Sequence, residues 1–184
     1  MTPAFDEYFM QMALREAARA AADGEVPAGC VIVDVTGLAP DAPPACARIL
    51  ARAHNQAEQL KDATAHAEML ALTAAANVRG AWRLTGTRLY VTKEPCPMCA
   101  GAIVLARPDA VIWGASDPKR GGGTVFGIFD HPGINHHPQI VPGVLEALCV
   151  AQLKAFFRAR RAAAQSETKS QDEISGLIGG RPEC

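Results

Sequence analysis

Two short strings in this sequence carry residue types that bind a metal ion. His66-Ala67-Glu68 places an imidazole two positions before a carboxylate, and Pro95-Cys96-Pro97-Met98-Cys99 places two thiols three positions apart. Imidazole and thiolate are ligands that suit Zn²⁺, and three protein ligands leave the fourth tetrahedral position for water, as in a catalytic zinc site. The sequence therefore predicts that His66, Cys96 and Cys99 bind one zinc ion.

Both strings are predicted to lie at the start of a helix. The segment 66–76 is rich in Ala, Leu, Met and Glu, which are good helix formers. Pro97 suits an early helical position, and the apolar run 100–105 follows it. The positive end of a helix dipole favours the thiolate form of a cysteine. We therefore expect two helix N-termini to meet at one ion, with Glu68 beside the ion as a proton carrier and not as a ligand.

Each string has a simpler interpretation when it stands alone. A Cys-x-x-Cys pair also occurs in redox sites and as half of a structural zinc site. A His-x-Glu pair in an alanine-rich helix is usually a solvated helix end. The two strings occur together here, separated by the strand-like stretch 88–92, and this combination favours the catalytic zinc site.

Composition limits the class of protein. A chain of 184 residues with 49% hydrophobic and 20% charged residues is suited to one globular domain. Its net charge of −1 argues against a uniformly basic nucleic-acid binder, so any RNA contact must use a local patch. No stretch approaches the roughly 20 apolar residues of a membrane span, and the acidic N-terminus predicts no secretory signal. The six cysteines form no disulfide framework, which fits a reducing cytoplasm.

Strands and helices are predicted to alternate along the chain. Helices are expected over 6–22, 66–78, 97–106 and 144–164, and strands over 28–33, 48–53, 88–92 and 110–114, with 28–33 and 48–53 as a hairpin. The proline-rich segment 34–47 is predicted to be a surface loop. This order implies an α/β sheet covered on both faces. Residues 1–164 are predicted to form the catalytic domain, and the polar segment 165–184 a disordered tail.

The chain resembles the bacterial tRNA-specific adenosine deaminases, a branch of the cytidine-deaminase-like superfamily. The paired His-x-Glu and Pro-Cys-x-x-Cys strings are the signature of zinc-dependent base deaminases, so on their own they identify only the superfamily. Further matching strings lie at 25–29, 54–55, 62–68, 89–101 and 130–136. The string 130–136 and the ending 156–161 resemble the tRNA branch in particular.

The resemblance implies a three-layer α/β/α sandwich with a mixed central sheet, one Zn²⁺ per chain and a homodimer. The implied activity is hydrolytic deamination of adenosine to inosine at the wobble position (34) of a tRNA anticodon, with tRNA-Arg as the expected substrate. The expected partner is the anticodon stem-loop, in the cytoplasm. Neither a membrane nor DNA is expected as a partner.

The resemblance also implies roles for individual residues. His66, Cys96 and Cys99 would hold zinc, and Glu68 would carry protons. The purine would be bound by the Asn55 side chain and the backbone N–H of Ala67 in a pocket lined by Val26 and Pro27. Contacts to the flanking nucleotides are expected from Asp117, Lys119, Asn135 and His136.

Two basic segments are candidates for binding phosphates. The last predicted helix carries Lys154, Arg158, Arg160 and Arg161 beside a pair of phenylalanines. Cations neutralise phosphates and aromatic rings stack on unpaired bases, so Phe156 and Arg158 are predicted RNA contacts. The alternative is an amphipathic helix with Phe156 and Phe157 in the core and solvated arginines. Lys119 and Arg120, which precede three glycines at 121–123, are predicted to form a flexible basic loop.

Two other functions remain open from the sequence. A deaminase of free nucleobases such as guanine or cytosine would use the same zinc chemistry and would need no basic RNA-binding face. A catalytically inactive RNA-binding or zinc-structural subunit is the third possibility. Glu68 argues against the inactive subunit, because a protein without catalysis has no need of a proton carrier.

Overall fold

A mixed five-stranded sheet forms the middle layer of the molecule. The computed structural model describes residues 1–178, with side chains described through Ser166. The strand order is β2-β1-β3-β4-β5. The strands are β1 (Gly29–Asp34), β2 (Arg48–His54), β3 (Thr87–Lys93), β4 (Ala110–Ala115) and β5 (Gln139–Val141). Strand β1 is antiparallel to β2 and β3, whereas β3, β4 and β5 are parallel.

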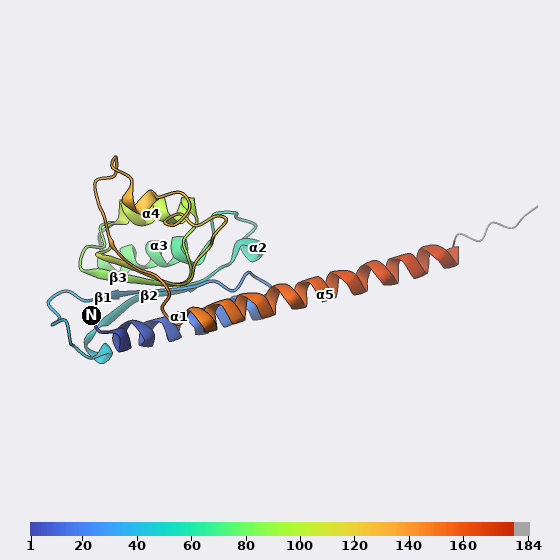
Figure 1. Ribbon diagram of the computed structural model, residues 1–184, viewed down its shortest axis with the longest axis horizontal. Helices are drawn as coiled ribbons and strands as arrows, with labels where there is room; N and C mark the ends of the chain where they lie inside the picture. Colours follow the sequence, from blue (N-terminus) through green and yellow to red (C-terminus); the bar gives the residue numbers. More distant parts are fainter. Residues whose placement is uncertain (179–184) are drawn as a thin grey trace, which may run out of the picture.

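Helices cover both faces of this sheet (Figure 1). One face carries α3 (Ala67–Arg79) and α4 (Pro97–Ala106), and the opposite face carries α1 (Pro3–Ala22) and the first part of α5 (Glu146–Ile178). The short helix α2 (Ala57–Leu60) precedes α3, and single turns of 3₁₀ helix lie at η1 (Pro44–Cys46) and η2 (Ile128–Asp130). The structure therefore confirms the predicted three-layer α/β/α sandwich with a mixed sheet.

The alternation of side chains along the strands builds two apolar cores. In β1, Cys30 and Ile32 belong to the core beneath α3 and α4, whereas Val31 and Val33 belong to the core beneath α1. Successive strand residues point to opposite faces, so a strand covered on both sides must be apolar throughout. This is why the continuous apolar run at 28–33 forms an inner strand.

Strand β1 begins in direct contact with the backbone of α1. A Cβ atom on Gly29 would overlap the carbonyl oxygen of Ala13 and would lie 2.5 Å from the backbone nitrogen of Ala17. Only glycine allows this close approach. The contact fixes the start of β1, and with it the segment 25–28 that precedes the strand.

A buried charged network joins α1 to β3. Arg88 Nη2 donates to both carboxylate oxygens of Asp6, at 2.9 and 3.0 Å, and the Tyr90 hydroxyl donates to Asp6 Oδ1 at 2.7 Å. Burial and the Asp6 charge raise the pKa of Tyr90, so its hydroxyl stays protonated and can donate. Removing one partner of a buried ion pair typically costs about 3–5 kcal/mol, so this network holds α1 firmly against β3.

The observed elements agree with the sequence predictions except in short segments and at one helix end. The β1–β2 pairing confirms the predicted hairpin. Helix α2 and strand β5 were not predicted, because elements of four and three residues are too short to show a periodic pattern.

Helix α5 differs from its prediction. It continues to Ile178, past the predicted end near Ala164, because residues 147–175 include neither Gly nor Pro to interrupt it. The division of the chain at residue 164 stays a prediction, and residues 179–184 of the predicted tail lie outside the described residues. Among the described residues, no helix is long and apolar enough to cross a membrane.

Candidate metal centre and active-site pocket

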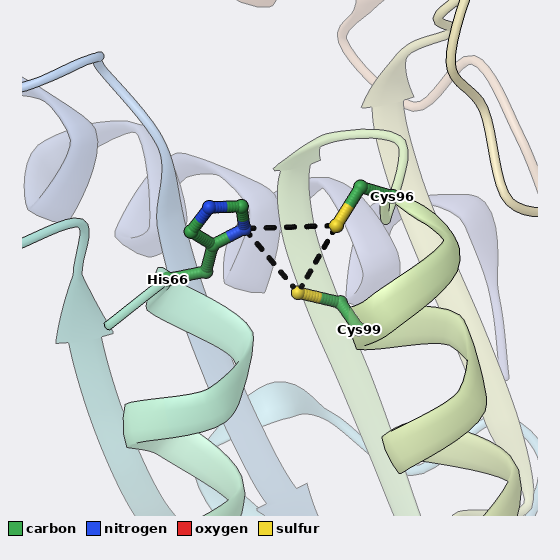
Figure 2. Close-up of side chains that lie close together, drawn as sticks. All are labelled: His66, Cys96 and Cys99. Carbon is green, nitrogen blue, oxygen red and sulfur yellow. Dashed lines mark hydrogen bonds between the residues drawn. The ribbon is translucent and has the colours of Figure 1, made fainter. Parts of the chain in front are cut away.

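His66, Cys96 and Cys99 meet where two helices begin (Figure 2). His66 is the N-cap residue of α3 and Cys96 the N-cap residue of α4, with Cys99 in the first turn of α4. His66 Nδ1 lies 3.7 Å from Cys96 Sγ and 3.5 Å from Cys99 Sγ, and the two sulfur atoms are 3.7 Å apart. The predicted meeting of two helix N-termini is confirmed.

These separations fit a tetrahedral zinc ion. Zn–S bonds of about 2.3 Å and a Zn–N bond of about 2.0–2.1 Å place two sulfur ligands about 3.8 Å apart, and sulfur and nitrogen about 3.6 Å apart. The observed distances are close to both values. Among the side chains that the structure describes, no other His, Cys, Asp or Glu joins the group. The donor set is therefore that of a zinc site with an open fourth position.

The three side chains are linked by hydrogen bonds that a metal ion would replace. Its hydrogen bonds with Cys99 and His66 lower the pKa of Cys96 to about 3, although burial acts in the opposite direction. The hydrogen bond with Cys96, together with burial, raises the pKa of Cys99. The hydrogen bond with Cys96 raises the pKa of His66. Zinc requires thiolates and a neutral imidazole, so zinc binding releases protons from this cluster.

Glu68 lies beside the cluster without belonging to it. It occupies the first turn of α3, and only 5% of its surface is exposed. Burial raises the pKa of its carboxyl group. A carboxylate whose pKa moves toward neutrality is better suited to accept a proton and return it. The geometry thus offers Glu68 as a base next to the metal ligands.

A cavity of about 230 Å³ opens next to this cluster. Its walls join four segments that are far apart in the sequence: 25–28, 55–58, 66–68 and 93–96. Val26 and Asn55, two of the residues predicted to bind the base, both line the cavity, and their contact with a base stays a prediction. Pro27 is buried next to Val26 and does not itself line the cavity. Ala67 is the first residue of α3, so its N–H belongs to the helical turn whose donors have no partner within the helix.

Asn55 is held by a buried carboxylate that the sequence analysis gave no role. Asn55 Nδ2 donates to Glu25 Oε2 at 2.9 Å, and the backbone N–H of Gln59 donates to Glu25 Oε1 at 2.8 Å. Glu25 is 1% exposed. Its partners lie 30 and 34 residues away, and no local pattern connects them. From the sequence, the only signal for Glu25 was that an acidic residue begins the matching string 25–29.

Glu94 is a second buried carboxylate to which the sequence pattern assigned no role. It accepts hydrogen bonds from the backbone N–H groups of Asp117, Gly123 and Thr124 at 2.8, 3.2 and 2.7 Å, and from the Thr124 hydroxyl at 3.0 Å. A Cβ atom on Gly121 would overlap the Glu94 carboxylate. The glycines therefore let this loop close on Glu94. The predicted flexible basic loop is in fact anchored by hydrogen bonds.

Asp117 forms an ion pair with Lys93, and Lys93 lines the cavity. Asp117 therefore lies next to the cavity without lining it. Partial burial raises the pKa of Asp117, but hydrogen bonds from Lys93 and from the backbone of Lys119 and Arg120 outweigh burial and lower it. The carboxylate therefore stays charged. The Lys119 side chain is exposed next to it.

Asn135 and His136 do not line this cavity. His136 Nε2 lies 2.7 Å from the carbonyl oxygen of Pro108, to which it donates. Pro108 follows the C-terminal end of α4, whereas Cys96 caps the N-terminal end of that helix. Asn135 is exposed. The predicted contacts of both residues with RNA stay predictions.

Helix α5 passes close to the cavity. Arg160 Nη2 lies 3.9 Å from Glu58 Oε1, and Glu58 lines the cavity. Phe156 is partly buried, whereas Phe157 is 41% exposed, so the alternative that places both rings in the core does not hold for Phe157. Arg158 is exposed on the same helix. Arg160 thus places one cation of α5 beside a residue of the cavity wall.

The fold and the ligand set define a zinc-dependent deaminase of the cytidine-deaminase-like class. Residues 3–115, which include all three metal ligands, match the cytidine and deoxycytidylate deaminase zinc-binding region. A tRNA-specific adenosine deaminase of Bacillus subtilis (strain 168) is 44% identical over 169 residues, covering 91% of this chain and 98% of the relative. Another, of Aquifex aeolicus (strain VF5), is 48% identical over 131 residues, covering 71% of this chain and 80% of the relative.

A solved structure from work on A-to-I editing by tRNA:A34 deaminases at the wobble position of transfer RNA has the same fold. It aligns with a TM-score of 0.70 at 38% identity, covering 79% of this chain and 98% of that structure. The chain therefore belongs to the family of tRNA-specific adenosine deaminases, as its resemblance to that family predicted.

Substitution of Glu68 and of Cys96 should affect zinc differently. Glu68→Ala is expected to retain close to one zinc per chain, because the three ligand atoms remain in place. Cys96→Ala is expected to lose most of its zinc, because only two ligands remain. Metal analysis of the purified variants gives the number of zinc ions per chain. Glu58→Ala, at an exposed carboxylate of the same cavity, is the control and should keep its zinc. Equal zinc loss in the Glu68 and Cys96 variants would identify Glu68 as a ligand.

Proposed function

We propose that this protein is a zinc-dependent tRNA adenosine deaminase that converts adenosine to inosine at the wobble position (34) of the anticodon, with tRNA-Arg as its substrate. The observation that carries the proposal is the cavity of about 230 Å³ with two of the three metal ligands, His66 and Cys96, and Glu68 on its wall. Such a cavity admits one base and not a paired stretch of RNA, so the target nucleotide must leave its stack. The 44% identity to a tRNA-specific adenosine deaminase supports the choice of substrate.

The reaction is the replacement of an amino group by oxygen. Zinc held by His66, Cys96 and Cys99 supplies a Lewis acid that lowers the pKa of water toward neutrality. Glu68 accepts a proton from the attacking water and delivers it to the ring nitrogen next to C6. Glu68 then moves the second proton to the departing amine, the C6–N bond breaks, and ammonia leaves. Its raised pKa suits both transfers.

The base is held by the walls of the cavity. The Asn55 amide offers both a donor and an acceptor, and the N–H of Ala67 at the start of α3 offers a second donor. Val26 lines the cavity. Pro27 is buried at its side and restricts the backbone of this wall.

The rest of the anticodon loop is proposed to lie across the edge of the cavity and along α5. Asp117 and Lys119 flank the edge, and Phe156 and Arg158 extend the surface on α5. Arg160 beside Glu58 supports this path, because it brings α5 next to the cavity. Asn135 and His136 are proposed as RNA contacts beyond the cavity.

An uncovered apolar face of α4 supports a homodimer. Helix α4 carries no charged side chain. Met98, Gly101 and Ala102 are partly exposed and Leu105 is 70% exposed, at the spacing of one helix face. The adjoining loop adds Phe126, which is 56% exposed. A surface helix usually turns a polar face to water, so we infer that a second copy covers this face.

The proposed location is the cytoplasm. The five cysteines that the structure describes are all free thiols. Free thiols persist in a reducing compartment, and thiolate ligands must escape oxidation to hold zinc.

Incubation with tRNA and with small molecules tests the proposed substrate. The zinc-loaded protein is expected to form inosine at position 34 of tRNA-Arg and to release ammonia, with Glu68→Ala as the inactive control. Free adenine, guanine and cytosine are expected to release none. Sequencing of the treated tRNA and an ammonia assay provide the two readouts. Ammonia from a free base without inosine in tRNA would identify a free-base deaminase instead.

Neutralising the α5 arginines tests the RNA surface. Changing Arg158, Arg160 and Arg161 together to Gln should raise the KM for tRNA and reduce the slope of log affinity against log salt by about 0.7–0.9 for each lost phosphate contact. Zinc content and Tm should stay the same, because exposed arginines contribute little to stability. Arg83→Gln, an exposed arginine beyond the far end of α3, is the control. Unchanged kinetics and salt slope would remove α5 from the RNA surface.

A single substitution on α4 tests the homodimer. Leu105→Glu would place a carboxylate in an apolar interface, where burial without a partner is costly. The expected result is a shift from dimer to monomer with zinc retained, measured by light scattering after gel filtration. Leu148→Glu, at an exposed leucine on α5, should leave the mass unchanged. A dimer that survives Leu105→Glu would contradict the proposed interface.

A further inference from the structure

Glu25 is a buried carboxylate with an unusual set of partners. It is 1% exposed, and among the described side chains no Lys, Arg or His forms an ion pair with it. Its two oxygens instead accept from Asn55 Nδ2 at 2.9 Å and from the backbone N–H of Gln59 at 2.8 Å. A charge is costly to bury and is kept in a fold only where its hydrogen bonds are satisfied. Among the described residues, the Asn55 amide is therefore one of the two hydrogen-bond donors to this carboxylate.

The carboxylate dictates which way the Asn55 amide is turned. An ionised carboxylate only accepts hydrogen bonds, whereas an amide has a donor side and an acceptor side. If the amide turned over, its Oδ1 would face Glu25 Oε2, and two acceptors would meet in a buried place. One orientation is therefore strongly favoured. It leaves Oδ1 and the second N–H of Asn55 for a ligand in the cavity.

Two hydrogen bonds donated by backbone N–H groups hold the same region. The N–H of Asn55 donates to the carbonyl of Ala28 at 3.0 Å. The bond from Gln59 to Glu25 ties the first turn of α2 to the segment before β1. Glu25 thus joins two walls of the cavity, 25–28 and 55–58, and Asn55 keeps both its position and its orientation.

We propose that Glu25 is a positioning residue that sets the donor and acceptor pattern which Asn55 offers to the base. Glu25 also lines the cavity, but its proposed contribution to specificity is made through the hydrogen bond that it accepts from Asn55. This inference rests on the proposed function, in which Asn55 binds the purine. The link between Glu25 and Asn55 does not depend on that function and is tested separately below.

The variant Glu25→Gln should reverse the donor and acceptor pattern that Asn55 offers, because Gln has almost the same shape as Glu but carries an NH₂ donor. The oxygen of the new amide can accept from the N–H of Gln59, and its NH₂ group then faces Asn55. Asn55 must turn over to accept that hydrogen bond with Oδ1. The base would meet a reversed amide, and kcat/KM for an anticodon stem-loop is expected to fall about 10- to 100-fold, as for loss of a charge-assisted hydrogen bond. Glu7→Gln makes the same change at an exposed glutamate of α1, outside the cavity, and should leave kcat/KM within about twofold.

A double-mutant cycle separates positioning from direct contact. If Glu25 acts only through Asn55, then Glu25→Gln should have no further effect on kcat/KM in the Asn55→Ala background. A further tenfold loss in that background would show that Glu25 touches the substrate or supports the cavity in another way. A further loss of that size would overturn the proposal.

Nuclear magnetic resonance of the side-chain amides tests the link without substrate. The sequence has three asparagines, Asn55, Asn77 and Asn135, and the last two are exposed. In protein labelled with ¹⁵N-Asn, the signal lost in Asn55→Ala identifies Asn55. One of its two amide protons should lie downfield of those of the exposed pair, because it is hydrogen-bonded to a carboxylate. This shift should disappear in Glu25→Gln.

The NMR shift of the Asn55 amide and the formation of inosine in tRNA test the two proposals independently. Unshifted Asn55 protons in the wild-type protein, or a shift that survives in Glu25→Gln, would overturn the role of Glu25 whatever the enzyme does. Absence of inosine in tRNA together with the expected shift would overturn the proposed function and leave the link between Glu25 and Asn55 in place. The wild-type spectrum decides the point even if Glu25→Gln does not fold.

Discussion

The arrangement depends on one geometric constraint, the meeting of two helix N-termini at a point where one imidazole and two thiols can bind the same ion. The sheet makes this possible. Strands β2 and β3 are both antiparallel to β1, so both end at the same edge of the sheet. Helix α3 follows β2 and helix α4 follows β3, so both begin at that edge. The segment 25–28 precedes the antiparallel strand β1 and reaches the same edge, and the cavity forms where these segments meet.

Three buried glutamates around this edge show how environment assigns different tasks to one residue type. Glu94 accepts four hydrogen bonds from a loop and shapes the edge of the cavity. Glu25 accepts from one amide and one backbone N–H and orients Asn55. Glu68 lies next to the metal ligands, and burial raises its pKa toward the range useful for proton transfer. The hydrogen-bond donors around each carboxylate therefore decide whether it builds the site or takes part in the chemistry.

The fold was predictable where a pattern repeats over several residues. The buried strands at 28–33 and 88–92 and the helix at 97–106 follow from apolar runs, proline position and helix propensity. Short elements such as β5 and α2 carry no such pattern, and they form because neighbouring backbone groups complete their hydrogen bonds. Helix α5 passes its predicted end because a polar composition does not exclude a helix when no Gly or Pro intervenes.

The zinc ligands and the proton carrier can be predicted from the sequence, because residue type and spacing determine what can bind zinc and carry a proton. His66, Cys96, Cys99 and Glu68 were identifiable without coordinates for that reason. Glu25 and Glu94 were not, because their roles come from partners about 30 residues away that only the folded sheet brings within reach. Spacing along the chain reports local geometry. The tertiary structure alone decides which distant donors surround a buried carboxylate, and so which role it has.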